Sequence, residues 1–129
     1  MNRYEREGIT IDLLEGRKVL VCASSTYSSM VFEDVLAELE GLQAVPDSVN
    51  RTNGQQTITT GQGWLAFART RSEMTRYAPD VVLFSAAIRQ DPDFHHLWLP
   101  DALAITQNSS ITADQPRHRL RRPVEQLSG

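Results

Sequence analysis

Two short, uninterrupted apolar runs dominate the pattern of hydrophobic and polar positions along the chain. The first lies in Arg17–Ser25, RKVLVCASS, between Gly16 and a group of small polar residues. The second is Val81–Phe84, in PDVVLF. Runs of this length are typical of strands that are buried on both faces of a sheet. The pattern therefore predicts two neighbouring strands of one sheet, with any chemistry at their carboxyl ends.

Helical periodicity follows the first run. Ala23–Ser29 is predicted to be a loop, and an amphipathic helix is predicted over about residues 29–41, with Ser28 or Ser29 as its N-cap and Gly41 at its end. A further helix is predicted within residues 9–15, closed by Gly16, although an alternating, strand-like pattern is also present there. The order strand, loop, helix is typical of the first half of a βαβ unit.

Alternation with a period of two replaces the helical pattern over residues 48–69. It predicts a β-meander of three short antiparallel strands, added to the parallel core and turned at Asn53-Gly54 and at residues 61–63. Short helices are predicted over about 72–77, capped by Ser72, and over about 92–98. Leu103–Ile105 is predicted to form an edge strand. The fold class is therefore α/β: a small parallel-core sheet flanked by helices, with an antiparallel meander.

Composition and charge divide the chain into a domain, residues 1–105, and a polar, basic tail, residues 106–129, which is expected to be flexible. Residues 1–113 carry 9 basic and 14 acidic side chains, whereas residues 114–129 carry 4 and 2. The acidic body argues against a broad phosphate-binding face. No apolar run approaches the ~20 residues of a membrane span, and no signal-peptide core is present, so a cytoplasmic protein without membrane contact is expected.

The order of these segments resembles a fragment of the P-loop ATPase domain of phage terminase large subunits and related helicase-like motors. The likeness covers about residues 9–88 and is carried by three stretches: EGRKVLVCASS, NGQQTITTGQGWLAFARTRS and PDVVLF. The resemblance implies a strand and loop leading into a helix, a hairpin that presents arginines, and a strand that in the family carries the Walker B acids.

Both halves of the family's nucleotide site are missing from this chain. The Walker A pattern GxxxxGK(S/T) is absent, and the only lysine, Lys18, lies on the first strand without a glycine-rich loop before it. Ser85 and Ala86 stand where the family has Asp and Glu. A hydroxyl and a methyl group cannot hold magnesium by charge or act as a base. No catalytic residue, metal site or cofactor is therefore predicted.

Two groups of residues are candidates for binding phosphate or nucleic acid. The first group lies at the start of the predicted helix, where hydroxyls and free amides can bind an anion; the alternative is an ordinary capped loop. Its members are Ser24, Ser25, Thr26, Ser28 and Ser29. Three arginines follow the hairpin, with surface ion pairs to Glu73 and Asp80 as the alternative. These are Arg69, Arg71 and Arg76.

Three further features are weaker candidates. Asp91, Asp93, His95 and His96 are metal-ligand types, but at most two of them converge on one helix face, and capping is the simpler interpretation. Cys22 is expected to be a buried small residue. The tail can bind nucleic acid or an acidic protein surface through four arginines, or can simply aid solubility. They are Arg117, Arg119, Arg121 and Arg122.

These observations lead to one functional hypothesis and one alternative. The hypothesis is a non-catalytic, phage-type accessory protein, derived from a terminase- or helicase-like ATPase, that binds a host or phage protein or a nucleic acid. The truncated sheet leaves an edge open, which favours a homo-oligomer or a docked partner. The alternative is an enzyme: a subunit that completes a nucleotide-hydrolysing site with another chain, or a small metal-dependent phosphoryl-processing enzyme.

Overall fold

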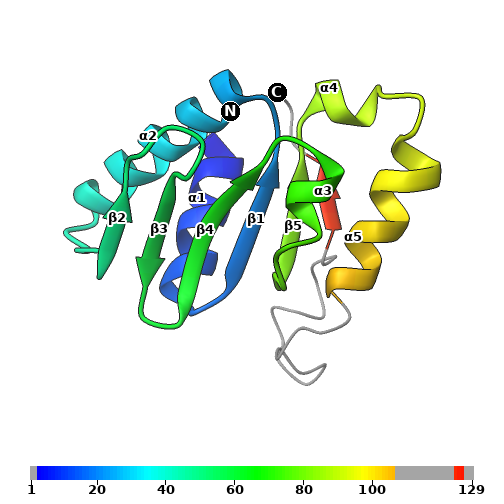
Figure 1. Ribbon diagram of the computed structural model, residues 1–129. Coiled ribbons are helices and arrows are strands. Elements are labelled where there is room, and N and C mark those ends of the chain that lie inside the picture. The colour runs from blue at the N-terminus through cyan, green and yellow to red at the C-terminus, as the bar shows by residue number, and fades with distance from the viewer. Residues whose placement is uncertain (1–2, 107–123, 127–129) are drawn as a thin grey trace.

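The structure, a computed structural model, describes residues 3–106 and 124–126 and has the predicted α/β fold. Helices flank a six-stranded mixed sheet with the strand order β2-β3-β4-β1-β5-β6 (Figure 1). The four tail arginines, Arg117, Arg119, Arg121 and Arg122, lie outside the described residues. Along the chain the elements are α1 (Arg3–Leu14), β1 (Lys18–Cys22), α2 (Ser25–Gly41), β2 (Ser48–Asn50), β3 (Thr57–Thr60), β4 (Gly63–Ala68), α3 (Arg71–Met74), β5 (Val81–Phe84), α4 (Ala86–Arg89), the π-helical segment η1 (Phe94–Trp98), α5 (Leu99–Thr106) and β6 (Val124–Gln126).

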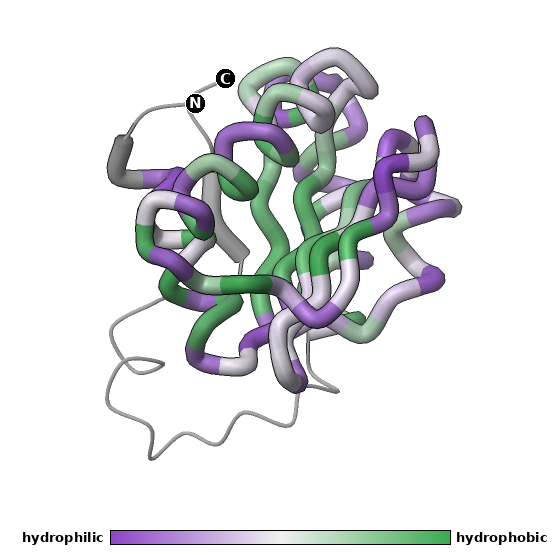
Figure 2. Tube along the Cα trace, turned by 90° about the vertical axis from the view of Figure 1, so that its left-hand side faces the viewer, coloured by the Kyte–Doolittle hydropathy of each residue, from purple (hydrophilic) through white to green (hydrophobic). Residues whose placement is uncertain are grey.

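The two apolar runs form adjacent strands at the centre of the sheet, as predicted. β1 pairs in parallel with β5 on one side and with β4 on the other, and the four residues from Val19 to Cys22 are fully buried. Alternate side chains of β1 face opposite layers. Val19 and Val21 pack in the cluster that includes α1 and α2, whereas Leu20 and Cys22 pack in the cluster that includes η1 and α5. Figure 2 shows the hydrophobic residues concentrated along these central strands.

The predicted meander is confirmed as β2, β3 and β4, with antiparallel pairing between successive strands. Its last strand, β4, is not an addition to the core, because it also pairs in parallel with β1. At the other end of the strand order, β6 pairs in parallel with β5. This strand is not predicted, since Val124–Gln126 lies within a polar stretch. Among the described residues, β2 forms one edge of the sheet, and all three of its residues are exposed.

Several predicted helix boundaries are wrong. α2 begins at Ser25 instead of residue 29, because the hydroxyl of Ser24 accepts the Tyr27 amide and so caps the helix four residues before Ser28. α3 is capped by Thr70 instead of Ser72. The helix expected over 92–98 begins at Phe94 and continues into α5, so the predicted edge strand Leu103–Ile105 is helical. Burial of Ala102 and Thr106, four residues apart, explains that helix.

Two further results concern the ends of helices and their length. α1 ends before Gly16, which has a φ of +82° and so takes the expected left-handed position. Within the described parts of the chain, no helix is long and apolar enough to cross a membrane.

The start of β4 lies unusually close to the corner that joins α1 to β1. A Cβ atom on Gly63 would lie 2.7 Å from the carbonyl oxygen of Leu13 and 2.8 Å from that of Arg17. The hydroxyl of Thr60 donates to the same Leu13 oxygen at 2.8 Å. At this corner the buried guanidinium of Arg17 also contacts Asp12 and Glu15. The absence of a side chain at Gly63 is therefore what allows β4 to lie beside β1.

We expect Gly63→Ala to lower the free energy of unfolding by about 2 kcal/mol or more, because the added methyl group would press on backbone atoms that cannot turn away. Urea denaturation measures the change. Gly41→Ala is the matched control, since a Cβ at Gly41 meets nothing within 4 Å. That control should be neutral or stabilising by up to about 1 kcal/mol. Equal stability of the two variants would contradict the close-approach argument.

Candidate functional site

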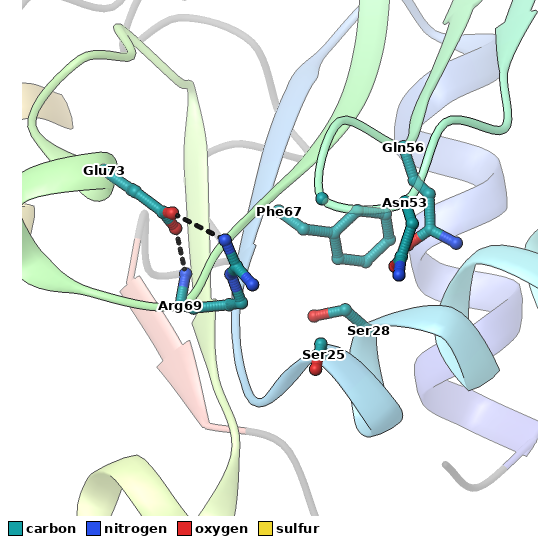
Figure 3. Close-up of a pocket in the computed structure, with 8 residues that line it drawn as sticks. Ser25, Ser28, Asn53, Gln56, Phe67, Arg69 and Glu73 are labelled. Atoms are coloured by element: carbon teal, nitrogen blue, oxygen red, sulfur yellow. Dashed lines mark hydrogen bonds and ion pairs between the residues drawn. The ribbon is translucent and has the colours of Figure 1, made fainter.

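A small pocket lies at the carboxyl edge of the sheet, where β1 and β4 end side by side. Three segments surround it: the first turns of α2, the loop between β2 and β3, and the residues at the end of β4 (Figure 3). The pocket is small, with about 20 Å³ of space that water-sized molecules can enter. Its lining residues are Ser25, Ser28, Asn53, Gly54, Gln56, Phe67, Arg69 and Glu73.

The N-terminus of α2 forms one wall. Ser24 closes the helix start, since its hydroxyl accepts the Tyr27 amide at 3.2 Å and its carbonyl accepts the Ser28 amide at 2.9 Å. The first amides of any helix have no partner within the helix, and the helix dipole places partial positive charge there. In this 17-residue helix, that end borders the pocket at Ser25. The wall therefore favours an anion.

Ser28 supplies a hydroxyl that the protein itself does not use. The residue is only 3% exposed, and its Oγ has no hydrogen-bond partner among the described residues. Figure 3 shows the hydroxyl directed toward the side of the pocket where Arg69 lies. A buried hydroxyl without a partner costs about 1–3 kcal/mol. An acceptor atom of a ligand in the pocket would remove that cost.

Arg69 and Glu73 form the opposite wall. Glu73 accepts the Arg69 amide at 2.8 Å and contacts the Arg69 Nη2 at 3.2 Å. The backbone hydrogen bond from Arg69 is the main reason that the pKa of Glu73 is lowered, with the charges of Arg69 and Arg76 adding to it. Because a guanidinium has five N–H donors, this contact leaves donors free for a ligand. The Arg69 side chain is 51% exposed.

The loop between β2 and β3 is held against α2 by polar contacts. Gln56 donates to the Ser29 hydroxyl at 3.3 Å, and Arg51 pairs with Glu33 at 2.9 Å. Gly54, with a φ of +83°, brings the loop close to Arg69, since a Cβ there would lie 3.9 Å from the Arg69 Nη2. The amides of Asn53 and Gln56 thus border the pocket from this side.

The structure brings together only part of the predicted site. Ser25 and Arg69 line the same pocket, but Ser24 is the helix cap and Thr26 is exposed outside it. The three arginines do not share one side, because β4 ends at Ala68 and α3 turns the chain away. Arg71 pairs with Asp101 of α5 at 3.0 Å, and Arg76 lies beside a separate groove.

Sequence reasoning missed four lining side chains of the pocket and named a fifth, Ser28, as a candidate while misplacing it in the local structure. Ser28 was expected to be in a loop or at a helix cap, and a cap at Ser24 is the signal that would have placed it one turn into the helix. For the others only Glu73 has a local signal, a Thr-x-x-Glu pattern of the capping-box type beginning at Thr70. The missed residues are Asn53, Gln56, Phe67 and Glu73.

The end of β5 has no acidic group. Ser85 is buried, its hydroxyl accepts the Ile88 amide at 3.4 Å, and its own amide donates to the Cys22 carbonyl at 3.0 Å. Burial raises the pKa of the Cys22 thiol far above its ordinary value, so the thiolate nucleophile does not form. Asp91 accepts the Asp93 amide at 2.8 Å in a local turn, and the N-cap of η1 is Asp93, so the predicted capping by Asp91 is wrong. Within residues 5–106, no three His, Cys, Asp or Glu side chains gather as metal ligands.

Comparison of the chain with protein-family models, curated proteins and solved structures finds no match. The likeness to terminase and helicase motors therefore rests on the sequence stretches alone, and the function is argued from the pocket.

We expect Glu73→Gln to lower the free energy of unfolding by less than about 1 kcal/mol near neutral pH, because the Arg69–Glu73 pair is partly exposed and screened by solvent. A carboxyl group whose pKa is lowered on folding stabilises the protein above its ordinary value of 4.5, and that contribution is lost as the pH falls through the lowered pKa. The difference between wild type and variant should therefore shrink on acidification.

Urea denaturation between about pH 7 and about pH 3 measures this difference. Glu40→Gln, at an exposed position of α2, is the matched control and should show no comparable trend. A difference that grows as the pH falls would contradict the lowered pKa of Glu73.

Proposed function

We propose that the protein is a non-catalytic accessory module of the phage type, derived from a terminase- or helicase-like ATPase, that binds phosphate groups of a nucleic acid at the pocket between α2 and β4. The observation that carries the proposal is the buried, unpartnered hydroxyl of Ser28, directed into a pocket that Arg69 and a helix N-terminus also border. These groups are donors or positive charges, which together suit an anion with several acceptor oxygens.

The same residues support binding without hydrolysis. Glu73 is the only carboxylate that lines the described pocket, and it is held by Arg69. Lys18 is the first residue of β1, whereas the pocket lies beyond the last residues of β1 and β4. Lys18 is therefore at the other end of the strands from the pocket. Ser85 and Ala86, at the end of β5, offer no carboxylate for a metal ion. A phosphate in the pocket would therefore meet the donors of Ser28 and Arg69, and the one carboxylate beside it, Glu73, is already paired with Arg69.

Arg69→Gln should weaken binding of a labelled oligonucleotide by about 10-fold and reduce the salt dependence by about one counterion, because one phosphate contact is lost. Glu73→Gln should strengthen binding, since it removes the carboxylate that competes for Arg69. Fluorescence anisotropy at about 50 and about 200 mM salt measures both effects.

Arg71→Gln is the matched control, because Arg71 pairs with Asp101 away from the pocket. Its affinity should equal that of wild type. Absence of binding at the lower salt, or an affinity that salt does not change, would contradict the phosphate contact. Hydrolysis of Mg-ATP by the purified protein would contradict the non-catalytic part of the proposal.

Ser28→Ala should change stability and binding in opposite directions. The substitution removes a buried hydroxyl that lacks a partner, so the free energy of unfolding should rise by about 1 kcal/mol. The oligonucleotide affinity should fall several-fold, because a ligand hydrogen bond is lost. Ser29→Ala is the control for stability: its hydroxyl accepts from Gln56, so that variant should be less stable. A Ser28→Ala protein that is less stable and binds normally would show that Ser28 has only a structural role.

A further inference from the structure

One half of the sheet is open on the face opposite α1 and α2. On that face α3, η1 and α5 cover β1, β5 and the end of β4. Within residues 3–106, no helix covers the same face of β2, β3 and the beginning of β4 (Figure 1). The strand pattern matches this exposure, because β3 buries Ile58 against the helices and turns Thr57 and Thr59 to the open side.

A row of cross-strand partners runs over this open face. Ser48 of β2 pairs with Thr59, Thr59 with Trp64 of β4, and Trp64 with Lys18 of β1. Since adjacent strands are about 4.8 Å apart, the four residues form a continuous band across the sheet. The band is polar at the β2 edge, aromatic in the middle and cationic at β1.

A shallow groove lies over the inner part of this band. It contains about 410 Å³ of space that small molecules can enter, which is within the range of ligand sites. The Trp64 and Tyr77 rings lie in contact beside it, with centroids 5.6 Å apart and planes tilted by 46°. Both rings are half-buried, since they also pack on the core cluster of that face. The polar, charged and aromatic residues that line the groove are Lys18, Thr57, Thr59, Trp64, Arg76 and Tyr77.

The groove has cations but no carboxylate among its described lining residues. One carboxylate lies close to the groove without lining it: the buried side chain of Asp80 accepts the Lys18 amide at 2.9 Å. The charge of Arg76 acts on Glu73. The acidic residues of the two long helices belong to elements that cover the other face of the sheet. They are Glu5, Glu7, Asp12, Glu33, Asp34, Glu38 and Glu40. The open face is therefore the one that suits an anionic partner.

We infer that the groove on this open face binds unpaired nucleotides of a single-stranded nucleic acid, with a base against Trp64 and neighbouring phosphates near Lys18 and Arg76. A partly exposed aromatic ring with flanking cations and hydroxyls suits single strands, because every base has a face that stacks. A duplex cannot offer that face, since its bases are stacked on one another. The inference extends the proposed function by naming the form of nucleic acid, and it uses different residues.

The test compares binding of a labelled single strand with binding of the matching duplex to wild type and three variants. Trp64→Leu keeps an apolar side chain against Tyr77 and should weaken single-strand binding by about 10-fold, with little effect on the duplex. Arg76→Gln is at an exposed position and should weaken binding and lower the salt dependence by about one counterion. Arg71→Gln, whose partner is Asp101, should bind as wild type. Circular dichroism and urea denaturation check that each variant is folded.

Each outcome decides between the groove and the pocket. Weaker single-strand binding by Trp64→Leu and Arg76→Gln supports the groove, whatever the effect of Arg69→Gln. If Trp64→Leu does not fold, Arg76→Gln alone decides. Weaker binding by Arg69→Gln only would overturn the groove and leave the proposed phosphate pocket standing. Equal affinity of wild type for single strand and duplex would overturn the groove as a single-strand site. Competition by poly-glutamate as strong as that by the oligonucleotide would also overturn it, because it would indicate an acidic protein surface as the partner.

Discussion

The close contact between Gly63 and the backbone of the α1–β1 corner determines where both candidate sites lie. That contact sets β4 beside β1 in parallel, with Lys18 opposite Trp64 at one end and Cys22 opposite Ala68 at the other. The carboxyl end of this pair places Arg69 next to the start of α2. The amino end places Trp64 next to Lys18 on the open face. One strand register therefore produces a pocket at the sheet edge and an aromatic, cationic groove on the face.

The sequence predicts the elements of this fold better than it predicts their partners. The predicted strand Val81–Phe84 has the same first and last residues as β5. A run of four consecutive apolar side chains fits a strand that is buried on both faces of the sheet. The helix α2 starts earlier than predicted because hydroxyl residues are tolerated in a first turn as well as at a cap. Ser28 and Arg69 share a pocket only through the pairing of β1 with β4. Such pairing joins segments that lie some forty residues apart, and no local pattern contains it.

The overall acidity of the chain gives a misleading picture of its surface. Seven of the 14 acidic residues within residues 1–113 lie on α1 and α2, whereas the groove on the open half of the sheet is lined by Lys18 and Arg76 without a carboxylate. At physiological salt, charges more than about 8 Å apart are largely screened from each other in solvent. A ligand on the open face therefore responds mainly to the nearby cations. Net charge argues against a broad phosphate-binding face, but it does not argue against a narrow one.

The pocket and the groove differ in what they cost the folded protein. Trp64 and Tyr77 gain stability from packing on the core, so the groove exists without any penalty. Ser28 is different, because its buried hydroxyl loses water and gains nothing from the protein itself. Arg69 does not carry this cost, because its side chain is 51% exposed and the donors that Glu73 leaves free can bond to water. An anion in the pocket would satisfy the Ser28 hydroxyl and so stabilise the folded protein. This difference is the physical argument for binding at that edge.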